Sequence, residues 1–203
     1  DEKDIAYRRG LFEVVGTDRA ITLFDLAAKT AEMKEKGEIA ESLDTKRDFD
    51  TPQTYPNGCH IAEVEVTPET GEVELVGYYA VDDCGVMLDS TLVHGQVQGA
   101  IAQGVGQVLL ENAVYDPDSG QLVTGSYMDY AMPRAHHMPA NLRDASHPVP
   151  ATTNPLGVKG VGEAGTTASL AAIMNAIADA VPAAAHMDMP ATMEKVWRAC
   201  QSG

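Results

Sequence analysis

A glycine-rich stretch at residues 154–167 carries the side chains best suited to chemistry. Four glycines fall within nine residues there, and Lys159 and Glu163 lie between them. Glycine lets a backbone adopt left-handed conformations and approach a ligand closely. The Ala-rich run at residues 168–181 predicts a helix whose N-terminal amides face the loop. A lone glutamate in this setting is a candidate general base.

The same stretch contains a Gly-x-Gly-x-x-Gly pattern at residues 160–165. A dinucleotide-binding fold needs a buried strand before this pattern and an acidic residue at the end of a second strand. Prolines precede the loop instead, and Asp179 falls inside the following helix, so the context excludes that fold. What remains is a loop able to approach an anionic or oxygen-rich group. From the residues alone, Glu163 can be either a general base or a helix cap. Lys159 can pair with Glu163, contact an anion or be a surface charge.

The elements that must position this loop begin with a hairpin. Apolar and acidic residues alternate at 61–66, a turn follows at 68–71, and a second alternating run covers 72–81. This pattern predicts two antiparallel strands. Asp82 and Asp83 come next and are interpreted as part of a turn.

A helix is predicted from about residue 91 to 110, with Asp89 as its cap. Interior glycines cost about 1 kcal/mol each relative to alanine, so they indicate close approach of a backbone or a ligand. Three glutamines share one face of this helix, and we expect them to hydrogen-bond a buried group. The glycines are Gly95, Gly99 and Gly106, and the glutamines are Gln96, Gln103 and Gln107.

The N-terminal part of the chain has weaker patterns. A strand is predicted at residues 11–15 and a short helix at 23–31. Residues 32–57 are dense in charge and end in prolines, which predicts a solvated helix and then a loop.

The middle and end of the chain complete the expected elements. A second hairpin is predicted at residues 111–124, a surface loop at 139–155 and a last amphipathic helix after Met189-Pro190. The adjacent His136 and His137 would diverge in regular structure, so we interpret them as surface residues rather than a metal pair.

Composition narrows the class of protein. The chain has 203 residues and a formal net charge of −16, which argues against nucleic acid or an anionic membrane as main partner. Its three cysteines form no Cys-x-x-Cys pair, so the sequence contains no pattern for a zinc or iron–sulfur site. Without a signal-type or membrane-spanning run, we expect a cytoplasmic α+β protein. We expect one domain over residues 1–203, in which 1–57 is peripheral and 58–203 forms the motif-bearing core.

Several motifs, taken in order, resemble the molybdenum hydroxylases, the family of xanthine dehydrogenase, aldehyde oxidoreductase and aerobic carbon monoxide dehydrogenase. The likeness is greatest to the molybdenum-binding large subunit of the carbon monoxide dehydrogenase type, and it runs from about Gly58 to the C-terminus. The motifs are Asp83-Cys84-Gly85, Gly95-Gln96-Val97-Gln98-Gly99-Ala100 with Gln103-Gly104-Val105-Gly106, Asp129-Tyr130-Ala131-Met132-Pro133, and residues 154–165.

This resemblance implies a role for each site residue. Glu163 corresponds to the active-site base beside molybdenum, and Gln96 to the glutamine that contacts the pterin cofactor. The backbone of Lys159, Gly160, Val161 and Gly162 corresponds to the loop beside the molybdenum cofactor. In the family the pterin dithiolene holds the metal, so no protein side chain is expected to ligate it.

The resemblance also implies the wider function. The enzyme would hydroxylate a small molecule with water-derived oxygen and pass two electrons to iron–sulfur and flavin centres. The implied cofactors are molybdenum with molybdopterin in its cytosine dinucleotide form, and FAD and [2Fe-2S] clusters on partner subunits or domains. Family large subunits are several times longer, so we expect this chain to be a C-terminal part that needs the rest of the molybdenum subunit. Alone it should bind the cofactor poorly or not at all and be inactive. The alternative is a non-catalytic structural or assembly domain of the same family.

Overall fold

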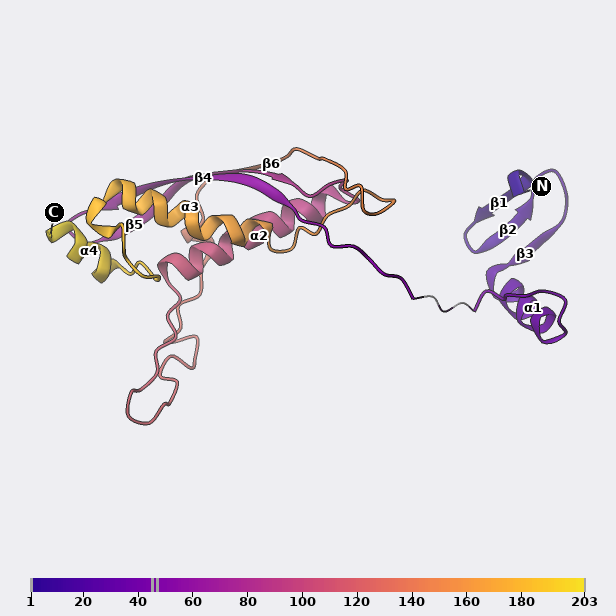
Figure 1. Cartoon of the computed structure of the whole chain (residues 1–203), viewed down its shortest axis with the longest axis horizontal. Coiled ribbons are helices and arrows are strands. Elements are labelled where there is room, and N and C mark those ends of the chain that lie inside the picture. Colours follow the sequence, from indigo (N-terminus) through magenta and orange to yellow (C-terminus); the bar gives the residue numbers. More distant parts are fainter. Residues whose placement is uncertain (1, 45, 47, 203) are drawn as a thin grey trace. The chain divides into compact units, whose positions relative to one another are not determined.

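The computed structural model describes residues 2–44, 46 and 48–202. The chain divides into two compact units, Asp1–Asp50 and Thr51–Gly203, which are described separately (Figure 1). Helices and small sheets occur in both, so the predicted α+β class is confirmed. The organisation as a single domain stays a prediction.

The first unit is a small sheet followed by one helix. After a 3-10 turn, η1 (Glu2–Asp4), the antiparallel strands β1 (Ile5–Arg8), β2 (Leu11–Val14) and β3 (Ala20–Thr22) pair in chain order. Helix α1 (Leu23–Glu35) begins where the Thr22 hydroxyl accepts a hydrogen bond from the Asp25 amide at 3.1 Å. The strand at β2 and the helix are confirmed, and the helix extends four residues beyond Ala31. Residues 45 and 47 of the predicted polar segment lie outside the described residues.

The second unit is built on a long hairpin and one added strand. Strands β4 (Asn57–Thr67) and β5 (Glu72–Asp83) are antiparallel, which confirms the predicted hairpin. Strand β6 (Asn141–Ser146) pairs parallel to β5 along Gly77–Asp82, so the prediction of a continuous loop at 139–155 is wrong. This strand has no apolar alternation to reveal it, because its pairing is decided by the backbone of β5.

Helices cover one face of this sheet. Helices α2 (Ser90–Leu109) and α3 (Ala164–Ala180) lie side by side, and α3 packs on β4 (Figure 1). A 3-10 turn, η3 (Pro182–Ala184), leads to α4 (Met193–Gln201). The three predicted helices are confirmed, including the Asp89 cap, whose carboxylate accepts from the Leu92 amide at 3.1 Å. The largest fully buried apolar side chains come from both layers: Tyr78, Ile101, Val105, Val108, Ile173, Ile177 and Val196.

A long irregular segment separates α2 from η2 (Ala135–His137) and projects from the helices in Figure 1. The predicted second hairpin is reduced there to one isolated bridge between Tyr115 and Leu122. An isolated pair of strands is marginal without further packing. The segment instead leaves Tyr127 and Met128 82% and 92% exposed.

Among the described helices, none combines the length and the apolar character that a membrane span requires.

Candidate functional site: a glycine-lined cavity at the start of helix α3

The first turn of α3 is fixed against the backbone of α2. A Cβ placed on Gly165 would lie 2.5 Å from the Val97 carbonyl oxygen and 3.1 Å from the Ile101 nitrogen. The Thr166 hydroxyl donates to the Ala100 carbonyl at 3.0 Å. Only glycine permits this approach at residue 165, and Gln96 precedes the contact by one residue.

The other end of the loop is held by the end of β5. Gly85 and Val158 form an antiparallel bridge, and the Lys159 amide donates to the Cys84 carbonyl at 2.9 Å. Gly85 has φ +67°, and a Cβ there would lie 2.2 Å from the Gly157 carbonyl oxygen. The left-handed backbone and the close approach together require glycine at residue 85.

An ion pair completes this attachment. The Lys159 ammonium donates to Asp83 Oδ2 at 2.5 Å, and the two side chains are only 12% and 8% exposed. Asp83 Oδ1 also accepts from the amides of Val149 and Gly85, each at 2.9 Å. The bond from Lys159, followed by the bond from Val149, holds the pKa of the Asp83 carboxyl well below its usual range. The suggested pairing of Lys159 with Glu163 is therefore wrong, and Asp83 is an anchor for the loop.

Glu163 occupies the N-cap position of α3 but does not cap it with its side chain. Its backbone carbonyl accepts from the Thr167 amide and hydroxyl at 3.0 Å. The carboxylate is exposed and has no hydrogen-bond or ion-pair partner among the described residues. The interpretation of this side chain as a helix cap is wrong, so the fold leaves the carboxylate available.

A cavity of about 590 Å³ lies at this carboxylate. Its walls come from the start of β4, the end of β5, the glycine loop and the first turns of α3: Pro56, Asn57, Gly58, Asp82, Gly160, Gly162, Glu163, Ala164, Thr167 and Ala168. A Cβ on Gly160 or Gly162 would meet nothing within 4 Å. Packing within the chain does not require these two glycines, which suits a surface that a ligand approaches closely.

The glycines of α2 fall into two groups. A Cβ on Gly106 would lie 2.8 Å from a ring carbon of Pro133, which confirms the predicted close packing. Gly95 and Gly99 face open space. Gln96, Gln103 and Gln107 are exposed, so the expectation of a buried partner for them within the chain is wrong. Gln96 does not line the cavity of Glu163.

The sequence did not reveal a buried polar group behind the cavity. His60 lies within hydrogen-bond distance of both Tyr78 and Asp82, and Asp82 lines the cavity. The strand pattern could have indicated the burial of His60, because His60 lies on the same face of β4 as Ala62 and Val64. A polar side chain on an inward face needs a buried partner.

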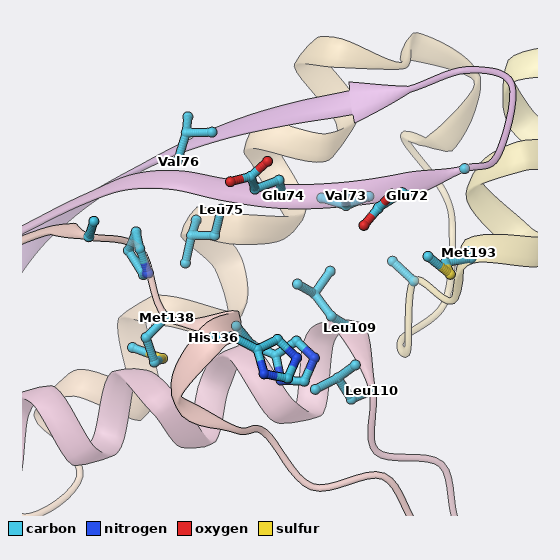
Figure 2. Close-up of a pocket in the computed structure, with 15 residues that line it drawn as sticks. Glu72, Val73, Glu74, Leu75, Val76, Leu109, Leu110, His136, Met138 and Met193 are labelled. Atoms are coloured by element: carbon cyan, nitrogen blue, oxygen red, sulfur yellow. The ribbon is translucent and has the colours of Figure 1, made fainter.

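A second cavity, of about 540 Å³, lies between β5, the end of α2 and the segment around His136 (Figure 2). His136 is exposed, as predicted, whereas His137 is half-buried and accepts from the Arg134 amide at 2.9 Å. Burial, together with His136 and Arg134 nearby, lowers the pKa of His137. No group of three potential metal ligands gathers anywhere in the described part of the chain. We assign the site to the first cavity, which joins an unpartnered carboxylate to open glycine backbone.

Comparisons with known proteins show the family to which the chain belongs. Residues 1–139 match the family described as the molybdopterin cofactor-binding domain. The chain is 35% identical over 98% of its length to the nicotine 6-hydroxylase large subunit of Paenarthrobacter nicotinovorans, covering 25% of that protein. It is 33% identical over 99% of its length to the 6-hydroxypseudooxynicotine dehydrogenase complex subunit gamma of the same organism, covering 26% of that protein. A crystal structure of a Cu,Mo-CO dehydrogenase in its carbon monoxide-reduced state superimposes with a TM-score of 0.76 at 26% identity, over 100% of this chain and 26% of the other.

The chain therefore belongs to the molybdopterin cofactor-binding domain family, and the two relatives above are parts of a hydroxylase and a dehydrogenase. This confirms the family resemblance read from the motifs. The chain spans about a quarter of the length of the relatives it matches.

The predicted site residues are partly gathered by the fold. Gly160, Gly162 and Glu163 line one cavity, and Lys159 lies beside it with its side chain bound to Asp83. Val161 is half-buried against the core. Open glycine backbone and an unpartnered carboxylate fit a flat, polar cofactor held without side-chain ligands to its metal. The roles of these residues stay predictions.

Proposed function

We propose that this chain supplies the active-site base and one wall of the cofactor pocket in a molybdenum hydroxylase. The observation that carries the proposal is the Glu163 carboxylate, which has no partner and lies in a cavity bordered by the open backbone of Gly160 and Gly162. The whole enzyme would carry molybdopterin in its cytosine dinucleotide form, with [2Fe-2S] clusters and FAD on partner subunits or domains.

Each residue has a defined task in this proposal. Glu163 accepts, at a carboxylate oxygen, the proton that water loses as its oxygen is added to the substrate carbon. The cofactor, when bound, supplies the oxygen transfer and takes up the two electrons. Gln96 offers an amide that both donates and accepts hydrogen bonds to the pterin. The backbone of Lys159, Gly160, Val161 and Gly162 lies along the cofactor, and the bond between Lys159 and Asp83 fixes that backbone.

The same geometry explains why the chain should be inactive alone. Glu163, Gly95 and Gly99 are open to solvent, whereas a general base works best in a site that excludes water. The remaining part of the molybdenum subunit would supply the missing walls and select the small-molecule substrate. Carbon monoxide, aldehydes and N-heterocycles remain the substrate classes to test.

The test compares variants of the assembled enzyme that contains this chain. Carbon monoxide, benzaldehyde, quinoline and nicotine serve as probes, with reduction of an artificial electron acceptor as the readout. Glu163→Gln should lower turnover by about 10²–10⁴-fold, the range expected for loss of a general base. Glu69→Gln, in the exposed turn between β4 and β5, removes the same charge away from the cavity and should retain activity. Full turnover by the Glu163→Gln enzyme at unchanged molybdenum content would refute the proposed role.

The exposure of Glu163 favours the one competing function, a non-catalytic structural or assembly domain. In that case the chain would be needed for the subunits to associate, while Glu163→Gln would change neither turnover nor molybdenum content. The Glu163→Gln and Glu69→Gln enzymes would then behave alike.

A further inference from the structure

Three buried polar side chains form a chain of hydrogen bonds behind the Glu163 cavity. His60, on β4, places Nδ1 2.8 Å from the Tyr78 hydroxyl and Nε2 3.2 Å from both carboxylate oxygens of Asp82. The side chains of His60 and Asp82 are 1% and 5% exposed, and Tyr78 is fully buried. The His60 and Tyr78 rings meet edge to face, with centroids 5.6 Å apart.

The partners assign the direction of these bonds. An ionised carboxylate only accepts, so His60 Nε2 carries hydrogen and donates to Asp82. His60 Nδ1 then accepts from the Tyr78 hydroxyl. Burial and, to a smaller extent, the charge of Asp82 raise the pKa of Tyr78, so this hydroxyl keeps its proton and remains a donor. With these bond directions, every buried polar atom of the three side chains has a partner.

Asp82 is the member of this hydrogen-bonded chain that lines the cavity. It lines the same cavity as Glu163, whereas His60 and Tyr78 do not. Gly58 makes room for it, because a Cβ at that position would lie 2.3 Å from Asp82 Oδ1. His60 Nε2 is equidistant from both carboxylate oxygens, so one oxygen can take a proton while the other still accepts from His60.

Among the charged groups near Glu163, Asp82 remains as the group that can accept a proton. Asp83, next along β5, is committed to Lys159 and to the amides of Val149 and Gly85. From α3, the charged group at this cavity is Glu163 itself. A base that has taken a proton from water must lose it before the next turnover.

We propose that Asp82 accepts the proton from protonated Glu163, with His60 and Tyr78 as the positioning residues that hold the Asp82 carboxylate. The inference rests on the proposed function of Glu163. In the step, the O–H bond of Glu163 breaks and an O–H bond forms on Asp82, directly or through water in the cavity. Glu163 regains its negative charge and Asp82 loses its own. The proton then leaves Asp82 for water in the cavity.

The first test is spectroscopic and uses the full chain. In ¹⁵N spectra of the His60 ring, we expect Nε2 to be protonated and Nδ1 to be bare. Tyr78→Phe removes the donor to Nδ1 but leaves Asp82 in place, so Nε2 should stay protonated while the Nδ1 resonance shifts. A proton on Nδ1 and a bare Nε2 in the wild-type chain would overturn the proposal, because His60 could not then donate to Asp82.

The second test uses the assembled enzyme and the probe that reduces it. We expect Asp82→Asn to lower kcat at least about tenfold, with a nearly unchanged KM and a larger solvent deuterium isotope effect. A purely structural Asp82 would not raise that isotope effect. Asp179→Asn, at the exposed far end of α3, is the matched control and should behave as wild type.

His60 provides a variant that keeps Asp82 in place. His60→Gln retains a side-chain N–H and should recover most of the activity that His60→Ala loses. Wild-type kcat and isotope effect in Asp82→Asn, beside an inactive Glu163→Gln enzyme, would overturn this inference and leave the proposed function intact. Full activity in Glu163→Gln would instead overturn the proposed function.

Discussion

Replacing Gly165 with alanine should separate α3 from α2 and displace the Glu163 carboxylate. The new Cβ would lie 2.5 Å from the Val97 carbonyl oxygen, 2.9 Å from the Ala100 Cβ and 3.1 Å from the Ile101 nitrogen. These atoms belong to the helix backbone or are fixed to it, so no rotamer change relieves the contact. Restoring an ordinary contact of at least 3.4 Å requires the helices to move apart by about 1 Å.

The size of the effect follows from two opposing contributions. Overpacking of this kind costs up to about 3 kcal/mol, and alanine in place of glycine returns at most about 1 kcal/mol of helix propensity. The net loss of unfolding free energy should be about 2 kcal/mol. In the assembled enzyme a 1 Å displacement of Glu163, two residues before Gly165, could lower kcat by up to about 10²-fold.

Gly99→Ala is the matched control for this substitution. It adds the same Cβ to α2 at a position where nothing lies within 4 Å, so it should stabilise the chain by about 0.5–1 kcal/mol. Urea unfolding followed by fluorescence of Trp197, the single tryptophan, reports on the second unit for both variants. Equal stability of the Gly165→Ala and Gly99→Ala chains would refute the reasoning, because the helix–helix contact would then impose no constraint.

Three further perturbations test the loop, the open helix face and the buried thiol. Lys159→Met should lower the urea midpoint of the chain at pH 6. The pKa of Asp83 is depressed in the folded state, so the ionised carboxylate contributes to the free energy of unfolding above about pH 4, and this contribution is lost as the pH falls. The difference in urea midpoint between the variant and the wild type should therefore shrink towards about pH 3. An unchanged difference across that range would contradict the role given to the ion pair. Gly99→Ala should lower the molybdenum content of the assembled enzyme although it stabilises the chain. A full molybdenum content in metal analysis would argue against a cofactor or subunit at the open face of α2. Burial raises the pKa of the Cys84 thiol, so iodoacetamide should modify the exposed Cys59 first and Cys84 only after urea unfolding. Peptide mass spectrometry measures the modification of each cysteine. Equal rates of modification of Cys59 and Cys84 in the folded chain would contradict the burial of Cys84.

The local patterns were sufficient to predict the main elements around the site. Alternation at residues 61–66 and 72–81 predicted β4 and β5, and the apolar repeat after residue 168 predicted α3. The same patterns placed Glu163 and its glycines at the start of a helix. These features depend on periods of two or 3.6 residues, which the sequence displays directly.

The tertiary structure alone decided which side chains meet. Lys159 finds Asp83, 76 residues earlier in the chain, and no local pattern distinguishes this partner from Glu163. Strand β6 forms because the backbone of β5 offers it an edge, although its own sequence is polar. The division of the glycines also depends on packing, since Gly165 lies against α2 while Gly99 faces open space.

The cavity around Glu163 depends both on the local sequence and on the tertiary structure. The sequence determined that a carboxylate would follow a glycine loop at a helix start, because residue type and order are local. Only the folded chain determined that this carboxylate is left without a partner and that Asp82, held by His60, faces the same cavity. Hydrogen bonds between strands depend on register and distance in space, which the order of residues does not specify.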